Sequence, residues 1–114
     1  MEPLLLEITV VTPVANEGAG APASDERSVH VRGEVDMSSA GQLAEFLSGV
    51  LADGATKVVI DASDISFLDS TGLRVLVDVA TRLEAAGGTL VVEPMSSNVR
   101  RVLEMTGLLD RYSA

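Results

Sequence analysis

The chain contains no cysteine and no tryptophan, and it has a single histidine, His30. The absence of cysteine excludes disulfide frameworks, thiol catalysis and Cys-ligated zinc. A single imidazole makes a histidine metal site or a Ser-His-Asp triad improbable. We therefore expect no metal and no cofactor, and we interpret His30 as an exposed or edge histidine without partners for such chemistry.

Aromatic residues and positive charges are also scarce. Phe, Trp and Tyr make up 3% of the chain, and 8 Lys and Arg residues stand against 17 Asp and Glu, for a net charge of −9. Such a chain is a poor match for phosphate backbones, for anionic lipid and for the stacking of bases on aromatic rings. We therefore expect no direct nucleic-acid partner.

Long apolar runs and a basic leader are missing as well. No run approaches the roughly 18 residues of a membrane span, and the first residues, Met-Glu-Pro, lack the positive start of a signal peptide. Hydrophobic residues nevertheless make up 46% of the 114 residues, which excludes disorder caused by low hydropathy. We therefore expect a single domain spanning residues 1–114, located in the cytoplasm.

The pattern of apolar residues predicts two strands at the start of the chain. Residues 4–11 and 29–35 both alternate between apolar and polar side chains, which is typical of half-buried strands. Residues 12–27 between them are rich in Gly, Pro and small polar residues and predict a flexible loop. The two strands are expected to pair as an antiparallel hairpin with an unusually long loop.

Helices and strands then alternate. Ser39 with Gln42 forms a capping-box pattern at the start of a helix that ends at Asp53-Gly54. The elements expected after it are an interior strand over 57–61, a helix over about 70–86, an interior strand over 89–93 closed by Pro94, and a helix capped by Ser97 and ended by Gly107. The order β-β-α-β-α-β-α predicts an α/β fold, a mixed sheet of four or five strands with helices packed on it.

Enzyme motifs are absent from this pattern. Neither glycine-rich phosphate loop is present, and the G-x-S-x-G elbow is missing. We therefore expect a protein that is not an enzyme.

One segment, residues 61–73 (DASDISFLDSTGL), has the composition of a site. It is expected to join the strand ending at Asp61 to the next helix, with its apolar side chains pointing inward and Asp69, Ser70 and Thr71 held at the helix N-terminus. Ligands and partners meet open α/β sheets at such carboxyl ends of strands. The alternative is that Asp69 or Ser70 only caps the helix. However, Gly72 in the first turn costs up to about 1 kcal/mol against Ala, which indicates that something approaches the backbone there.

The same segment resembles the signature of the STAS domain, D-x-S-x-[aliphatic]-x-F-[aliphatic]-D-S-[ST]-G, and within that group it is most similar to the anti-sigma factor antagonists. Residues 33–36 (GEVD) are similar to the end of the family's second strand, and residues 97–108 are similar to its late helix. Together the similarities cover roughly residues 28–109. The loop over 12–27 is longer than the tight hairpin usual in the family.

The resemblance implies a partner-switching regulator. Unphosphorylated antagonists of the family bind an anti-sigma factor that is also a serine kinase, and this binding frees the sigma factor. The kinase phosphorylates a serine that corresponds to Ser70, which releases the antagonist, and a serine phosphatase resets it. Thr71 is the second candidate acceptor. The partner-binding surface is expected to include Asp36, Asp69, Ser70, Thr71 and Gly72.

The helix after Ser70 also carries an exposed row of charges, Arg74, Asp78 and Arg82, with Val75 and Val79 along its flank. We expect Arg74 to extend the partner-binding surface. The alternative is a solvated face whose charges pair with one another at i, i+4 spacing.

Two other functions are compatible with the sequence. The first is a STAS subunit of a larger complex, such as a stress-sensing assembly or a lipid-transport system, without a Ser70 switch. The second is a small enzyme or nucleotide-binding module, which the missing phosphate loop and the single histidine disfavour.

Overall fold

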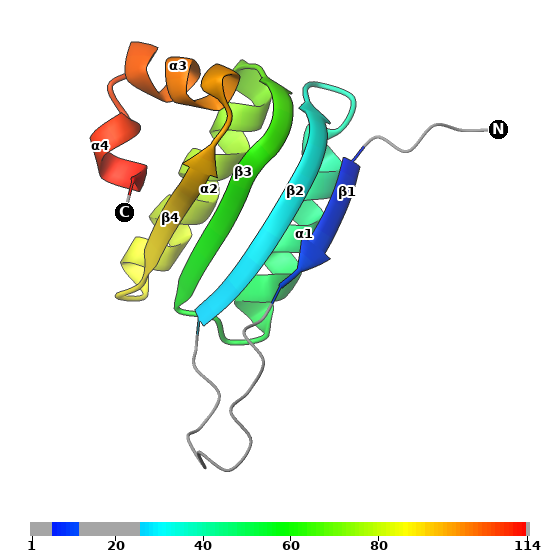
Figure 1. The fold of residues 1–114 in the computed structure, drawn as a ribbon. Helices are drawn as coiled ribbons and strands as arrows, with labels where there is room; N and C mark the ends of the chain where they lie inside the picture. Colours follow the sequence, from blue (N-terminus) through cyan, green and yellow to red (C-terminus); the bar gives the residue numbers. More distant parts are fainter. Residues whose placement is uncertain (1–5, 12–25, 114) are drawn as a thin grey trace, which may run out of the picture.

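A mixed four-stranded sheet forms the centre of the computed structural model, which describes residues 6–11 and 26–113 (Figure 1). Strand β1 is antiparallel to β2, whereas β2, β3 and β4 are parallel, and the strand order is β1-β2-β3-β4. The elements are β1 (Leu6–Val10), β2 (Glu26–Val35), α1 (Ala40–Ala52), β3 (Lys57–Leu68), α2 (Ser70–Ala85), β4 (Thr89–Met95), α3 (Ser97–Met105) and α4 (Leu109–Tyr112). The predicted order and fold class are confirmed, with α4 as an additional short helix.

The core lies between the sheet and the helices α1 and α2, which cover one of its faces (Figure 1). Alternate strand residues point toward these helices, as their period of two predicts. Apolar helix residues spaced by three and four positions pack against them. The buried strand residues include Val29, Val31, Val58, Ile60, Leu90 and Val92, and the buried helix residues include Leu43, Leu47, Leu76, Leu83 and Leu103. No helix in the described ranges is long and apolar enough to cross a membrane.

The predicted hairpin is present, because β1 and β2 pair from Leu6 with Gly33 to Val10 with Val29. Residues 12–25 of the predicted loop lie outside the described residues. Its last two residues were assigned wrongly, since Glu26 and Arg27 begin β2 and pair with the start of β3. Backbone pairing extends the strand here regardless of the polar side chains.

Strands β3 and β4 both run further than predicted. The sequence placed the end of one strand at Asp61, but β3 continues to Leu68, with irregular register against β2. The other strand was expected to be interior and to close at Pro94. Instead β4 is an edge strand of the described sheet and reaches Met95. An edge position tolerates proline because the missing N–H has no ladder partner to lose.

Two predicted helix caps are corrected. Ser39 makes no capping hydrogen bond, because its hydroxyl donates to the Glu34 carbonyl at 2.6 Å and accepts from the Asp36 N–H at 3.0 Å. The cap of α3 is Ser96, not Ser97: the Ser96 hydroxyl oxygen accepts from the Val99 N–H at 3.2 Å. Ser39 still occupies the N-cap position of α1 while its hydroxyl bonds elsewhere, and at α3 the adjacent Ser96 takes the cap in place of Ser97.

Candidate functional site

The predicted site residues from two distant segments meet at one end of the sheet, where β2 and β3 finish. Val35 pairs with Leu68 across these parallel strands, so the next residues, Asp36 and Asp69, emerge beside each other. The Asp69 N–H donates to the Val35 carbonyl at 3.1 Å, which ties the two chain segments together. We call Asp36, Asp69, Ser70 and Thr71 the serine edge.

Asp69 is the N-cap of α2. Its Oδ1 atom accepts hydrogen bonds from the N–H groups of Thr71 at 2.9 Å and Gly72 at 3.0 Å. Because Asp69 fills this role, Ser70 stands as the first residue of the helix with an exposed side chain, followed by the exposed Thr71. Within residues 6–11 and 26–113, neither hydroxyl makes a hydrogen bond. The capping alternative is therefore correct for Asp69, and it leaves both hydroxyls accessible.

Gly72 packs directly against the ends of β2 and β3. A Cβ atom at this position would lie 2.6 Å from Val35 Cγ1, 2.7 Å from Leu68 Cδ1 and 2.9 Å from the Val35 carbonyl oxygen. The sequence correctly predicted a close approach to this glycine, and the approaching groups are core residues of the same chain. Since Gly72 is buried, it contributes to the serine edge by setting how closely α2 sits on the strands.

Asp36 holds the turn between β2 and α1. Its Oδ1 atom accepts from the Ser38 hydroxyl at 2.7 Å and from the Ser38 N–H at 2.9 Å. These hydrogen bonds, that of the Ser38 hydroxyl first, hold the pKa of Asp36 below its usual value, because they favour the charged form. The serine edge therefore carries the ionised carboxylate of Asp36 at neutral pH.

Asn98 at the start of α3 also positions this edge, and the sequence analysis missed it. Its Oδ1 atom accepts from the Leu68 N–H at 2.8 Å, immediately before Asp69. The end of β3 is thus held by β2 on one side and by α3 on the other. No pattern in the sequence pointed to Asn98, because its partner lies 30 residues away along the chain.

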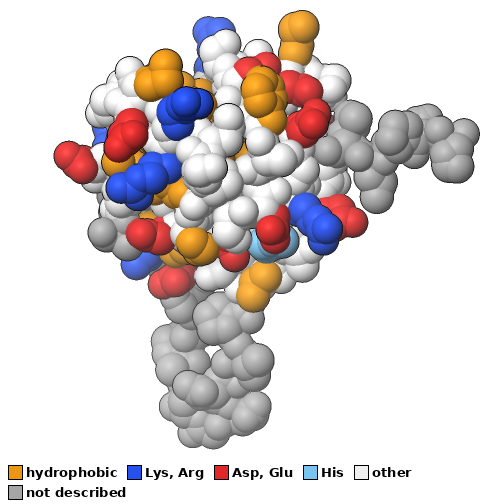
Figure 2. Space-filling model, turned by 45° about the horizontal axis from the view of Figure 1, so that its top comes forward, with side chains coloured by type: hydrophobic (Ala, Val, Ile, Leu, Met, Phe, Trp, Pro, Cys, Tyr) orange, Lys and Arg blue, Asp and Glu red, His pale blue; other side chains and the backbone are white. Residues whose placement is uncertain are grey.

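Two large apolar side chains are exposed close to the serine edge. Met37, next to Asp36, is 77% exposed, and Phe67, next to Leu68, is 43% exposed. The expectation that Phe67 points inward is wrong, although Ile65 and Leu68 are buried as predicted. Figure 2 brings this end of the molecule toward the viewer and shows hydrophobic side chains standing among acidic ones. Such exposure at the end of a sheet is compatible with a protein-binding surface.

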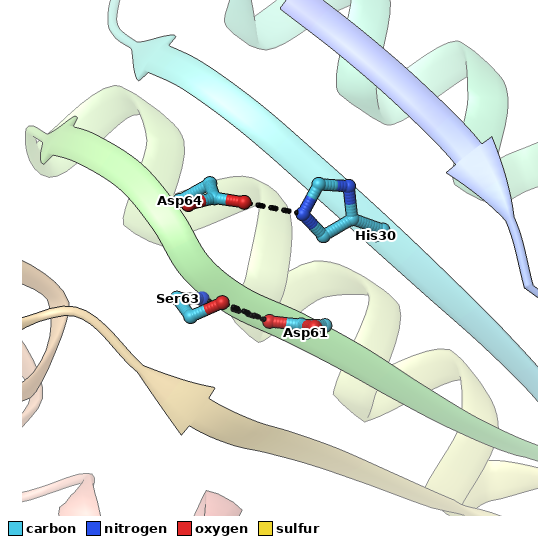
Figure 3. Close-up of polar contacts among 4 residues, drawn as sticks. All are labelled: His30, Asp61, Ser63 and Asp64. Atoms are coloured by element: carbon cyan, nitrogen blue, oxygen red, sulfur yellow. Dashed lines mark hydrogen bonds and ion pairs between the residues drawn. The ribbon is translucent and has the colours of Figure 1, made fainter.

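The single histidine is half-buried on the inner strand β2, so our interpretation of it as an exposed or edge histidine is wrong. His30 on β2 lies 2.7 Å from Asp64 on β3, and the neighbouring Asp61 accepts from the Ser63 hydroxyl at 2.6 Å (Figure 3). Burial raises the pKa of Asp61, but the hydrogen bonds from Ser63 and the charge of His30 outweigh it and lower that pKa. The contact between His30 and Asp64 spans the irregular register between β2 and β3, whereas the bond between Ser63 and Asp61 lies within β3.

These four residues do not form a Ser-His-Asp relay. The Ser63 hydroxyl donates to the Asp61 carboxylate, whereas the imidazole is bonded to Asp64 (Figure 3). Among the residues that the structure describes, no group of three or more His, Asp or Glu side chains could hold a metal ion.

The charged row on α2 is exposed at Arg74, Asp78 and Arg82, as predicted. Its flank was assigned wrongly in part, because Val79 is buried in the core. The Arg82 guanidinium donates to the Ser48 hydroxyl at 3.1 Å, whereas Arg74 makes no hydrogen bond or ion pair to any described residue. The row is therefore exposed, and its charges form no ion pairs with one another among the described residues.

Replacing the cap of α2 should destabilise the protein. We expect Asp69→Ala to lower the free energy of unfolding by about 0.5–2 kcal/mol, because the N–H groups of Thr71 and Gly72 lose their acceptor. Asp69→Asn keeps an acceptor oxygen and should cost less. Urea unfolding monitored by circular dichroism measures both, and equal stability of Asp69→Ala and the unsubstituted protein would contradict the capping role.

Comparison with known proteins gives a consistent result. The model of the STAS domain family matches residues 22–112. The anti-sigma-B factor antagonist of Bacillus subtilis is 38% identical over 82 residues, which cover 72% of this chain and 74% of that protein. The crystal structure of an anti-sigma factor antagonist from Mycobacterium paratuberculosis superposes with a TM-score of 0.69 at 29% identity, over 93% of this chain and 83% of that one. The unphosphorylated anti-sigma factor antagonist SpoIIAA shares the fold, with a TM-score of 0.70 at 22% identity over 90% of this chain and 84% of that one.

Proposed function

The chain belongs to the STAS domain family, and from that premise we propose that it acts as an anti-sigma factor antagonist switched by phosphorylation of Ser70. In the unmodified state it binds an anti-sigma factor through the serine edge, and the anti-sigma factor then releases its sigma factor. The observation that carries the proposal is the position of Ser70: an exposed hydroxyl on the first residue of α2, beside the ends of two parallel strands.

The geometry suits a switch that leaves the fold intact. A phosphate on Ser70 adds about −1.5 to −2 charges at neutral pH. The Ser70 side chain makes no hydrogen bond in the described ranges, so its modification breaks none of these contacts. The added charge stands beside the carboxylates of Asp36 and Asp69 on the surface where the partner binds. Modification should therefore change binding far more than stability.

The partners follow from the same proposal. The anti-sigma factor is also a serine kinase: the terminal phosphoryl group of ATP passes to Ser70 Oγ, which loses its proton, and ADP leaves. A serine phosphatase hydrolyses the phosphoserine and restores binding. The chain itself is a binding module without catalytic residues. It acts as one domain over residues 1–114, in the cytoplasm where transcription takes place.

Incubation with the cognate anti-sigma factor and ATP tests this function. Intact-mass measurement should show one added phosphate, and peptide mapping should place it on Ser70, with Thr71 as the only acceptable second site. Binding without phosphorylation would favour a STAS subunit of a larger complex. Nucleotide binding by the isolated protein in an equilibrium assay would favour a nucleotide-binding module.

Charge reversal at Arg74 should weaken binding to the anti-sigma factor. Arg74 lies one helical turn after Ser70 on the exposed face of α2, so it falls at the rim of the proposed surface. We expect Arg74→Glu to reduce affinity by about tenfold, with a change in the free energy of unfolding below about 0.5 kcal/mol. Arg82→Glu, two turns further from Ser70, is the matched control. Equal affinities of the two variants, measured by calorimetry, would remove Arg74 from the surface.

A further inference from the structure

The first turn of α2 has few unoccupied backbone N–H groups that could donate hydrogen bonds to a phosphate on Ser70. The N–H groups of Thr71 and Gly72 already donate to the Asp69 carboxylate, and the Leu73 N–H donates to the Asp69 carbonyl at 2.9 Å. Helix N-termini bind anions through these groups, and here the cap has taken them. Among the described residues, only the Ser70 N–H of this turn is left without an acceptor, so a nearby cationic side chain would supply most of the compensation for the phosphate charge.

The surroundings of Ser70 make that compensation necessary. Asp69 precedes it, and Asp36 emerges beside Asp69 with a lowered pKa, so Asp36 is ionised at neutral pH. A phosphate placed there meets two carboxylates of the same sign. A positively charged side chain within reach would relieve this repulsion.

Arg74 is the cation in the right place. It follows Ser70 at i+4 on the same helix, a spacing that brings side chains onto one face. Arg74 is exposed and has no hydrogen bond or ion pair to another described residue, whereas Arg82 bonds to Ser48 and Arg111 pairs with Glu84. Its guanidinium is therefore available to a phosphate.

We propose that Arg74 is the internal partner of phosphorylated Ser70, an inference that rests on the proposed modification of that serine. The planar guanidinium of Arg74 can donate two hydrogen bonds to the oxygens of a phosphate on Ser70, one helical turn toward the N-terminus. Pairing gives phosphorylation a second effect. The phosphate adds negative charge to the serine edge, and its pairing with Arg74 withdraws that side chain from the partner-binding surface.

The pKa of the phosphate tests this pairing directly. Phosphoserine can be installed at residue 70 by genetic encoding, and the phosphorus NMR shift followed against pH gives its second pKa, which is about 6 for the free group. A nearby cation favours the dianion, so Arg74→Gln should raise that pKa by roughly 0.2–0.4. Arg74→Lys should restore part of the difference, and the matched control Arg82→Gln should leave the pKa unchanged.

Two results would overturn the pairing. One is an identical phosphate pKa with and without Arg74. The other is a larger rise for Arg101→Gln than for Arg74→Gln. Arg101 is an exposed cation on α3, one turn after Asn98, so this result would place the phosphate against α3. Circular dichroism of each variant confirms that α2 is intact. Because the phosphoserine is installed without a kinase, failure of enzymatic phosphorylation at Ser70 defeats the proposed function and leaves this measurement valid.

Discussion

Phosphate on Ser70 is expected to lower affinity for the anti-sigma factor by about 100-fold or more. Charges of unfavourable sign or without partners cost several kcal/mol inside a protein interface, and each 1.4 kcal/mol corresponds to tenfold in affinity. Ser70 is exposed at the start of α2, beside Asp36 and Asp69, so the phosphate adds to an existing concentration of negative charge. Its bulk also separates the surfaces that must touch.

Two substitutions bracket this effect. Ser70→Ala should stay bound, resist phosphorylation and change the free energy of unfolding by less than about 0.5 kcal/mol, because Asp69 provides the cap of α2. Ser70→Asp should fold equally well and bind more weakly than Ser70→Ala. Its loss should be smaller than that of the phosphorylated protein, since one carboxylate replaces a near-dianion with three acceptor oxygens.

Calorimetry should measure the affinity of the anti-sigma factor for four forms: the unmodified protein, the phosphorylated protein, Ser70→Ala and Ser70→Asp. These four affinities test whether Ser70 is a switch. Thr56→Ala is the control, because Thr56 is an exposed hydroxyl at the opposite end of β3 from Ser70. If all forms bind alike, or if the phosphate maps outside Ser70 and Thr71, the switch is wrong and the STAS fold still stands.

Gly72→Ala is expected to destabilise the protein by about 1–3 kcal/mol, the usual cost of forcing extra atoms into a packed site. The new Cβ would lie 2.6 Å from Val35 Cγ1 and 2.9 Å from the Val35 carbonyl oxygen. A side chain can rotate away, but the carbonyl belongs to the backbone that holds Asp69 in place. Relief of the contact therefore has to move α2 away from the strands, and the serine edge moves with it.

The same change at Gly49 in α1 is the control. Among the described residues, no atom outside the backbone of α1 itself lies within 4 Å of a Cβ placed there. Alanine favours helices over glycine by about 0.8–1 kcal/mol, so Gly49→Ala should stabilise the protein. Urea unfolding of both variants separates the effects of packing from helix propensity. A Gly72→Ala variant as stable as the unsubstituted protein would show that α2 does not press against Val35.

Local patterns in the chain were enough to predict the four strands, the three longer helices and most of their inward faces. The rows of α1 and α2 that contain Leu43, Leu47, Leu76 and Leu83 are buried as their spacing predicts. Such patterns are local, because the period of a strand (two residues) or a helix (3.6 residues) sets which nearby residues lie on the same face. The contiguous segment around Ser70 was recognisable for the same reason.

The way these elements combine into a site depends on contacts that form only in the folded chain. The extension of β3 through polar residues to Leu68 depends on backbone pairing with β2, to which side-chain type contributes little. That pairing places Asp36 beside Asp69, and Asn98 and His30 find their partners 30 and 34 residues away. The choice of Ser96 and Asp69 as caps, when adjacent serines were equally suitable, was also settled by the packing of each helix against the sheet. Contacts between residues far apart in the chain leave no local pattern, because their free energy arises only once the chain is folded.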